Sequence, residues 1–165
     1  MMRLYNVFMN KVWSFCYNLI LSLWIGGISI FTFIVTPAVF RSFERDMAGR
    51  IVGKLFPGYF IYNLALSALA LALLIMIRSF LTSKAFKFSL VLIICAIIIN
   101  LFVAFKLHPD INRIKQEIHS FETPADDSPL RKQFGRLHAV SATLNLLLLA
   151  DGITLLVFSS VMKKQ

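Results

Sequence analysis

Four long apolar runs constrain the fold of this chain more than any other feature. They cover approximately residues 12–40, 56–80, 86–107 and 134–162. A helix needs about 20 mostly apolar residues to cross the hydrocarbon core of a bilayer, and each run reaches that length. Hydrophobic residues make up 58% of the chain and the mean hydropathy is +0.77, which excludes a soluble domain. The sequence therefore predicts one all-α domain over residues 1–165, an integral membrane four-helix bundle in contact with the lipid bilayer.

The net charge of +9 comes from lysines and arginines in the flanks and connections of these runs. They do not alternate with aromatic residues along a stripe, so we predict no nucleic-acid partner. Four spans place both ends of the chain on one side, where basic residues are dense near the helix ends and acids are absent. The raw count of basic residues is higher on the other side, but there it is spread over longer loops that also carry acids. Because the positive-inside rule counts basic residues in short segments near the helix ends, we predict an N-in/C-in topology.

Two polar connections carry a helical pattern of their own. Between residues 40 and 55, apolar residues recur every three or four positions, which predicts a short amphipathic helix in the membrane interface or an extension of the first span. The Pro-Gly pair at residues 57–58 is expected to end it. The polar loop 108–133 begins with a second short amphipathic helix, and Ser128 followed by Pro129 marks the start of the fourth helix.

Small residues form two faces, which hold Ser22, Gly26, Gly27 and Ser29 in the first run and Gly49 and Gly53 after it. Small residues let a neighbouring backbone approach closely, so we predict helix packing as their role. The first run is also longer than a bilayer is thick, so it must tilt, kink or protrude. Pro37 marks the expected position of a kink.

The fourth run carries a polar stripe at helical spacing. His138, Ser141 and Asn145 lie on one face at i, i+3 and i+7, and the third run holds one strongly polar residue, Asn100. We expect Asn145 to form a hydrogen bond with Asn100 or with the backbone of the first span. Two interpretations stay open: hydrogen bonds that hold the helices together, or the lining of a path for a ligand or ion.

Asp151 is the only acid inside a run, and it lies on a different face of the helix from the polar stripe. A charge at the centre of a bilayer costs about 2.5–3.5 kcal/mol on insertion scales, so the carboxyl group should face the interior of the bundle. It is either a proton or cation site, or a neutral or capped group near the inner interface.

His108 and His138 flank the polar loop, so both are expected near the same membrane surface. Two histidines placed in this way could ligate b-type haem or a metal. Bis-histidine haem in a bundle usually needs both rings inside the spans, whereas a proline follows His108 at a helix end. We therefore predict no cofactor and keep haem b as an alternative. Paired carboxylates, a Ser-His-Asp set and a phosphate loop are absent from the sequence, so we expect no enzyme activity and assign no catalytic residue.

Two sequence blocks resemble a known family. Residues 48–60 read A-G-R-I-V-G-x-L-F-P-x-Y-F and residues 134–145 read F-x-x-L-H-x-x-S-x-x-x-N, while the first run carries Trp24-x-Gly26 and Pro37. Along nearly the whole chain, this pattern is similar to the transmembrane protein 205-like family, a four-span domain of unknown function found in bacteria and eukaryotes. The resemblance implies a four-helix membrane domain without a settled activity. The eukaryotic relatives are associated with drug and metal tolerance, which points weakly to transport or trafficking.

Copper-resistance inner-membrane proteins and membrane protoporphyrinogen oxidases also begin their first span with a W-x-G-like pattern. This chain has no histidine in its first run, and it has no cluster of Met and His suited to copper. Both departures argue against a copper or haem assignment.

Three functions remain open from the sequence, and we rank them in order. The first is a small helical subunit or scaffold that packs into a larger membrane complex, with other membrane subunits or a second copy as partners. The second is transport of, or tolerance to, a small solute, ion or metal by a homo-oligomer. The third is a b-haem redox protein. For all three we expect a location in the bacterial inner membrane.

Overall fold

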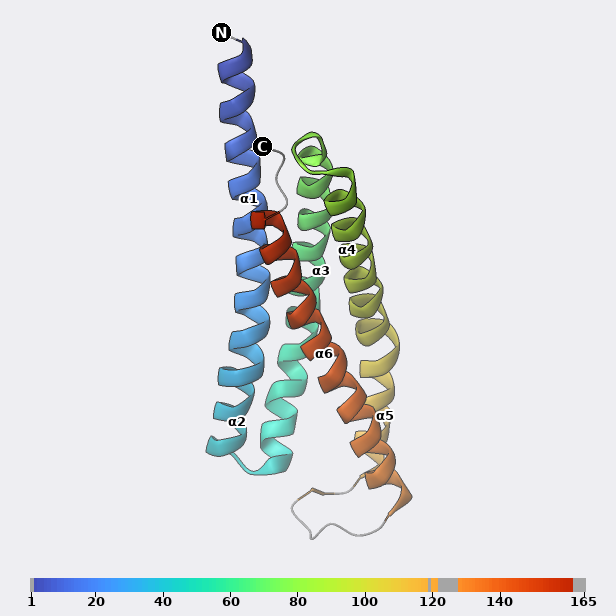
Figure 1. Cartoon of the computed structure of the whole chain (residues 1–165). Coiled ribbons are helices and arrows are strands. Elements are labelled where there is room, and N and C mark those ends of the chain that lie inside the picture. Colours follow the sequence, from blue (N-terminus) through green and yellow to red (C-terminus); the bar gives the residue numbers. More distant parts are fainter. Residues whose placement is uncertain (1, 119, 122–127, 162–165) are drawn as a thin grey trace.

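The computed structural model describes residues 2–118, 120–121 and 128–161, and for residues 2–8, 10, 80, 160 and 161 it describes the backbone alone (Figure 1). The helices follow in the order α1 (Met2–Ile30), the π-helical turn η1 (Phe31–Val35), α2 (Thr36–Ser42), α3 (Arg45–Met76), the 3-10 turn η2 (Arg78–Phe80), α4 (Ser83–Phe102), the π-helical turn η3 (Val103–Leu107), α5 (His108–Glu117) and α6 (Pro129–Val161). The fold is all-α, as the sequence predicts.

Four helical segments are long and apolar enough to cross a membrane, which confirms the number of predicted spans. They are Lys11–Ser42, Arg45–Met76, Ser83–Glu117 and Pro129–Ser159. Residues 122–127 of the predicted polar loop and the predicted end of the last span at residue 162 lie outside the described residues.

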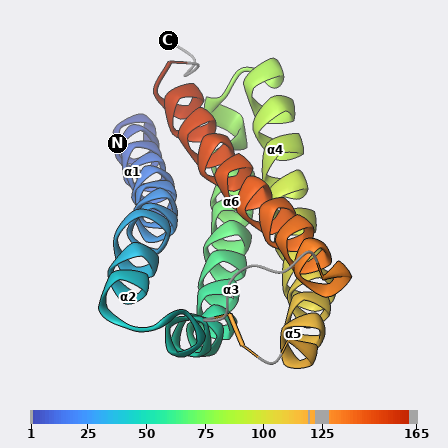
Figure 2. The same cartoon turned by 90° about the horizontal axis from the view of Figure 1, so that it is seen from below.

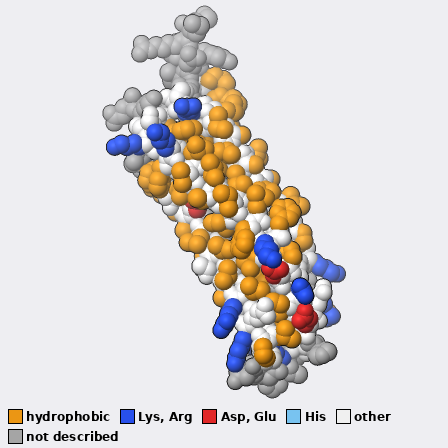
Figure 3. Space-filling view, turned by 90° about the vertical axis from the view of Figure 1, so that its right-hand side faces the viewer, with side chains coloured by type: hydrophobic (Ala, Val, Ile, Leu, Met, Phe, Trp, Pro, Cys, Tyr) orange, Lys and Arg blue, Asp and Glu red, His pale blue; other side chains and the backbone are white. Residues whose placement is uncertain are grey.

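The four segments form a ring in which each packs against two neighbours (Figures 1 and 2). α1 and α4 each contact both α3 and α6, and α6 runs obliquely to close the ring. The start of α1 and the end of α6 lie at one end of the bundle with the α3–α4 link, and the α2–α3 connection lies at the other. Apolar side chains cover the middle of the face in Figure 3, while Lys and Arg gather toward its ends. This distribution suits a surface that meets lipid between two polar layers.

Two of the spanning segments contain a wider helical turn just before a proline. η1 leads into Thr36-Pro37 and η3 leads into His108-Pro109, and in each case the residue before the proline bonds to the carbonyl five residues earlier. A proline has no N–H, and its ring clashes with the carbonyl four residues earlier, so a local π turn lets the helix continue past it. The change in geometry predicted at Pro37 therefore lies one turn earlier, in η1.

The segment between the first two spans differs from its prediction. α2 ends at Ser42 and α3 begins at Arg45, so residues 45–55 extend the second span rather than the first and form no separate interfacial helix. α3 also runs through Pro57 instead of ending there. Proline is tolerated inside a membrane helix because neighbouring groups and small backbone adjustments satisfy the carbonyl that it leaves without a donor.

The predicted features of the polar loop are present where the structure describes it. The amphipathic helix exists as α5, which continues the third span and ends at Glu117. α6 begins at Pro129, and the Oγ atom of Ser128 accepts a hydrogen bond from the backbone N–H of Arg131 at 3.4 Å. Ser128 therefore caps the last helix, as predicted.

A buried polar contact joins α1 to α3. Trp24 is fully buried, and its indole N–H donates to Oδ1 of Asn63 at 3.0 Å. The amide nitrogen of Asn63 in turn donates to the backbone carbonyl of Tyr59 at 2.9 Å. Because all three groups are satisfied away from water, this contact fixes the register between the two helices.

The close approach on α1 is made by Gly27. A Cβ atom there would lie 2.3 Å from Cε1 of Tyr62, whose hydroxyl donates to the carbonyl of Leu23. A Cβ atom on Gly26 would meet nothing within 4 Å, and Ser22 is exposed while Ser29 is half-buried. Gly27 therefore packs against α3, whereas no other described helix covers the surface of α1 at Ser22 and Gly26.

Candidate functional site

A polar hydrogen-bond chain lies beside a cavity of about 300 Å³, which we call the inner cavity and which residues of η1, α2, α3, α4, η3 and α6 line. The hydroxyl of Tyr59 donates to Oδ1 of Asn145 at 2.5 Å, and Nδ2 of Asn145 donates to Oγ1 of Thr32 at 2.7 Å. Asn145 thus joins α6 to α3 and to η1. This corrects its predicted partners, because the aromatic hydroxyl of α3 and a side chain of η1 replace Asn100 and the backbone.

Asn100 lines the same inner cavity from α4. The residue is 4% exposed, and its side-chain nitrogen has no hydrogen-bond partner among the described residues. Leaving a buried donor without an acceptor costs about 1–3 kcal/mol. The inner cavity therefore offers a polar group a donor that the protein itself does not use.

A second cavity of about 410 Å³, the middle cavity, brings the two predicted histidines to one place. His108 is half-buried with its ring 5.2 Å from that of Phe56, and the Asn112 amide lies 2.9 Å from its Nε2 atom. His138 is exposed and stacks on Phe134 with ring centroids 5.9 Å apart. Among the described residues, no group of three or more His, Cys, Asp or Glu could hold a metal ion. Haem binding between these rings stays an alternative from the sequence.

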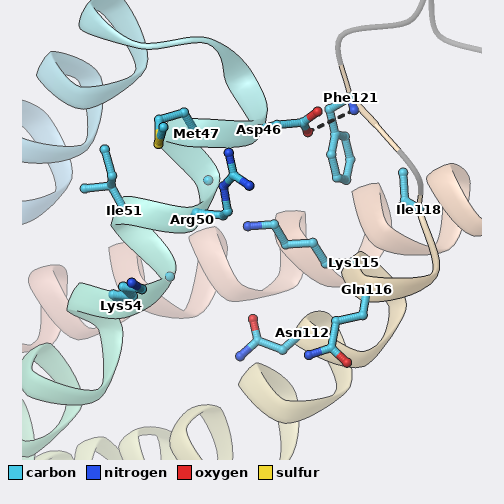
Figure 4. A pocket seen from close by; sticks show the side chains of 12 residues that line it. Asp46, Met47, Arg50, Ile51, Lys54, Asn112, Lys115, Gln116, Ile118 and Phe121 are labelled. Carbon is cyan, nitrogen blue, oxygen red and sulfur yellow. Dashed lines mark hydrogen bonds between the residues drawn. The ribbon is translucent and has the colours of Figure 1, made fainter.

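The outer cavity, of about 570 Å³, lies between the start of α3 and α5 and is rich in cations (Figure 4). Arg50 and Lys54 come from α3, and Lys115 extends from α5 toward α3. A Cβ atom on Gly49 would lie 2.8 Å from Nζ of Lys115, so the missing side chain at Gly49 makes room for this ammonium group. Gly49 therefore serves the approach of a charged side chain rather than of a helix backbone.

Among the described residues, Asp46 is the one acid that lines the outer cavity, and the chain after α5 holds it. Asp46 accepts hydrogen bonds from Oγ of Ser120 at 2.6 Å and from the backbone N–H of Phe121 at 3.0 Å (Figure 4). The guanidinium of Arg131 donates to the carbonyl of Ser120 at 2.6 Å. These bonds tie residues 120–121 to α3 and α6, and they fix one wall of the outer cavity.

The three cavities share wall residues and therefore adjoin one another, and we call them together the cleft. The inner and middle cavities have Thr36, Phe56, His138 and Ser141 in common, and the middle and outer cavities have Gly49, Gly53, Asn112 and Lys115 in common. The cleft therefore runs from the cations near the start of α3 to Asn100 and Asn145 inside the bundle. The residue before each of two prolines, Thr36 and His108, lines it directly after a π-helical turn. Such turns are frequent at functional sites.

Asp151 lies outside this cleft, against α1. It is half-buried, and its Oδ2 atom and the hydroxyl of fully buried Tyr17 have no hydrogen-bond partner among the described residues. The two groups are close enough to interact electrostatically. The next residue, Gly152, packs against Ile25, where a Cβ atom would lie 2.9 Å from Cγ1.

The structure thus brings together His138, Ser141, Asn145, Asn100 and His108, and it adds residues that the sequence analysis did not single out. In the sequence, Tyr59 stands out only as part of the block at residues 48–60, and Lys115 lies within the predicted polar loop 108–133. A signal was present for the second, because His108, Asn112 and Lys115 lie at i, i+4 and i+7 on one face of α5.

Comparison with known families identifies the chain by its first three spanning segments. Residues 19–120 match the domain of unknown function DUF4149, and this range covers more than half of the chain. The chain belongs to the DUF4149 family. The matched range contains the outer-cavity cations of this DUF4149 protein, and α6 lies beyond it. The finer assignment to the transmembrane protein 205-like family stays a prediction.

An uncharacterized protein of Aquifex aeolicus (strain VF5) is 41% identical to this DUF4149 protein over 54 residues. The aligned part is 33% of this chain and 41% of the relative, so the chain spans about two fifths of that relative's length. No solved structure matches.

Proposed function

We propose that this DUF4149 protein binds a small amphipathic solute in the cleft, within the plane of the membrane. The shared walls of the three cavities carry the proposal, because they bring a cation-lined end next to a largely apolar interior with unused hydrogen-bonding capacity at Asn100. Ligand sites in proteins are typically concave and mostly apolar, with a few placed polar groups, and between the helices of a bundle is a preferred location. The role is one of binding, without a catalytic step.

Gly53 gives a direct test, since it lines both the middle and the outer cavity and a Cβ atom there would meet nothing within 4 Å. Gly53→Leu should fill the cleft without disturbing helix packing. Gly58→Leu is the matched control, because Gly58 lies on the same helix, has equally open space and lines none of the three cavities.

The probe is a neutral monoacylglycerol that carries a diazirine on its acyl chain, added to the purified full-length protein. After photolysis, mass spectrometry maps the labelled peptides. We expect labels at cleft residues of α3, α5 and α6, and we expect Gly53→Leu to remove most of them while Gly58→Leu keeps them. Equal labelling of both variants, or labels only on lipid-facing positions, would refute the proposal.

A role as a subunit of a membrane complex is the second candidate, and the uncovered Ser22–Gly26 face of α1 favours it. Small residues on a lipid-facing helix surface allow close approach of another helix. Native mass spectrometry of gently extracted protein tests this role. A mass of 18.8 kDa alone would count against it, whereas a multiple of that mass or an added protein, lost in Gly26→Leu, would support it. Movement of a solute across the bilayer by so small a chain would also require a homo-oligomer.

The proposal places both termini on the cytoplasmic side of a bacterial inner membrane. Exposed basic residues near that end of the bundle, Lys11, Arg78, Lys84 and Lys87, support this orientation. A green fluorescent protein fused to the C-terminus should then fluoresce, and an alkaline phosphatase fused there should be inactive. The opposite pair of results would reverse the orientation.

A further inference from the structure

The outer cavity concentrates positive charge where the cleft opens. Within the part of the chain that the structure describes, Arg50, Lys54 and Lys115 line it together with a single carboxylate, that of Asp46. Among the described residues none of the three cations forms an ion pair. By contrast, two other cations of the segment that carries Lys115 are paired: Lys106 lies 3.2 Å from Asp110, and Arg113 lies 3.8 Å from Glu117. Arg50 and Lys115 lie within electrostatic range of Asp46, but three cations face this one described carboxylate, so the lining keeps a net positive charge for a ligand.

Lys115 marks the junction between the charged and the apolar part of the cleft. It lines both the outer and the middle cavity, and it is half-buried although lysine is among the residues most often exposed. Beyond it the walls turn apolar, with Pro37, Phe40, Val52 and Ile111. Amide side chains of Asn112 and Gln116 add hydrogen-bond donors on the charged side.

We propose that the solute of the cleft is an anionic phospholipid from the surrounding leaflet, with its phosphate in the outer cavity and one acyl chain in the middle and inner cavities. Phosphate oxygens match the three cations and the amide donors, and an acyl chain matches the apolar walls behind Lys115. Basic pockets between membrane helices bind anionic headgroups by the same combination of charge and confinement. The inference rests on the proposed function, since it requires that the cleft holds an amphipathic molecule.

Charge in a general sense does not explain this arrangement. Lys106 and Arg113 lie at the same end of the same spanning segment as Lys115, but they line none of the three cavities. A general attraction of basic residues to the bilayer surface would act equally on this pair and on the cations that line the outer cavity. Only the lining cations are placed to meet a headgroup whose chain enters the cleft.

The test titrates the full-length protein in detergent with phosphatidylglycerol, phosphatidylcholine or glycerol 3-phosphate and counts bound molecules by native mass spectrometry. We expect phosphatidylglycerol to bind most tightly and glycerol 3-phosphate to bind far more weakly, because it lacks the chain. Each basic residue near a membrane surface contributes about a fivefold preference for anionic lipid. Lys115→Gln should therefore lower the affinity for phosphatidylglycerol by about that factor, and Lys115→Arg should restore it. The affinity for phosphatidylcholine should fall less, because choline cancels the net charge of that headgroup.

Arg113→Gln is the matched control, since it removes the same charge from the same helix outside the cleft. Equal losses in Lys115→Gln and Arg113→Gln would overturn the proposal, and so would glycerol 3-phosphate that binds as tightly as the lipid. Arg50→Gln gives a second measurement at an exposed position if Lys115→Gln does not fold.

Neutral monoacylglycerol labelling is run on the same variants. If that labelling persists while the anionic preference is absent, only the headgroup assignment fails; if it never reaches the cleft, the proposed function fails.

Discussion

Asn145 offers a quantitative test of how the bundle is held together. Its amide accepts from Tyr59 of α3 at 2.5 Å and donates to Thr32 of η1 at 2.7 Å, so one side chain connects three parts of the ring. Hydrogen bonds between membrane helices contribute about 0.6 kcal/mol on average and at most about 1.7 kcal/mol. Asn145→Leu keeps a similar volume but removes both bonds and leaves two hydroxyl groups without this partner. We expect it to lower the free energy of unfolding by about 1–3 kcal/mol.

A double-mutant cycle isolates the contact with α3. Tyr59→Phe removes the hydroxyl alone, and the cycle with Asn145→Leu should give a coupling energy of about 0.5–1.5 kcal/mol. The measurement is equilibrium unfolding in mixed micelles by increasing SDS, followed by circular dichroism. Thr143→Ala is the control on the same helix, because Thr143 is exposed and should change stability by no more than about 0.5 kcal/mol.

Two results would refute this reasoning. A coupling energy below about 0.3 kcal/mol would mean that the two side chains do not interact in the membrane. A loss of stability in Thr143→Ala as large as that in Asn145→Leu would mean that the effect belongs to α6 in general rather than to its polar contact.

Three further predictions concern other parts of the bundle. Gly27→Ala should lower the free energy of unfolding by about 1–3 kcal/mol, because its Cβ atom would overlap the ring of Tyr62. Gly26→Ala should change the free energy of unfolding by no more than about 0.5 kcal/mol. Equal effects of the two substitutions in SDS unfolding would contradict the packing of α1 on α3. Asp151→Asn should leave monoacylglycerol labelling of the cleft unchanged, since Asp151 lines none of its cavities, and a loss of label would connect the two sites. Protein expressed with excess haem should show a featureless visible spectrum, and a Soret band that disappears in His108→Ala would instead establish haem binding.

The spans could be predicted from the sequence because membrane insertion depends on the length and polarity of each run alone. The path of residues 43–57 could not. The apolar spacing of this segment fits an extension of the first span as well as an extension of the second. That α3 begins at Arg45 depends on contacts of this helix with the rest of the bundle. Pro57 is a helix breaker in water, but within a bundle the neighbouring helices compensate for its missing donor.

The stripe of His138, Ser141 and Asn145 could be predicted as an inward face, because helical periodicity fixes which residues of α6 point the same way. The partners across the bundle could not, since the register between helices is set by long-range packing such as Trp24 on Asn63. The position of Lys115 could not be predicted for the same reason. It lies against α3 because Gly49, more than sixty residues earlier, has no side chain.

The burial of Trp24 has a consequence for spectroscopy. The chain has two tryptophans, Trp13 and Trp24, and both belong to α1. Neither lines the cleft, and Trp24 is fully buried with its N–H bonded to Asn63. The Trp24 part of the intrinsic emission therefore reports on the contact between α1 and α3. A shift of that emission to longer wavelength signals that these two helices have separated. Because no tryptophan lines the cleft, its occupancy can be followed with a fluorescent lipid in the same sample.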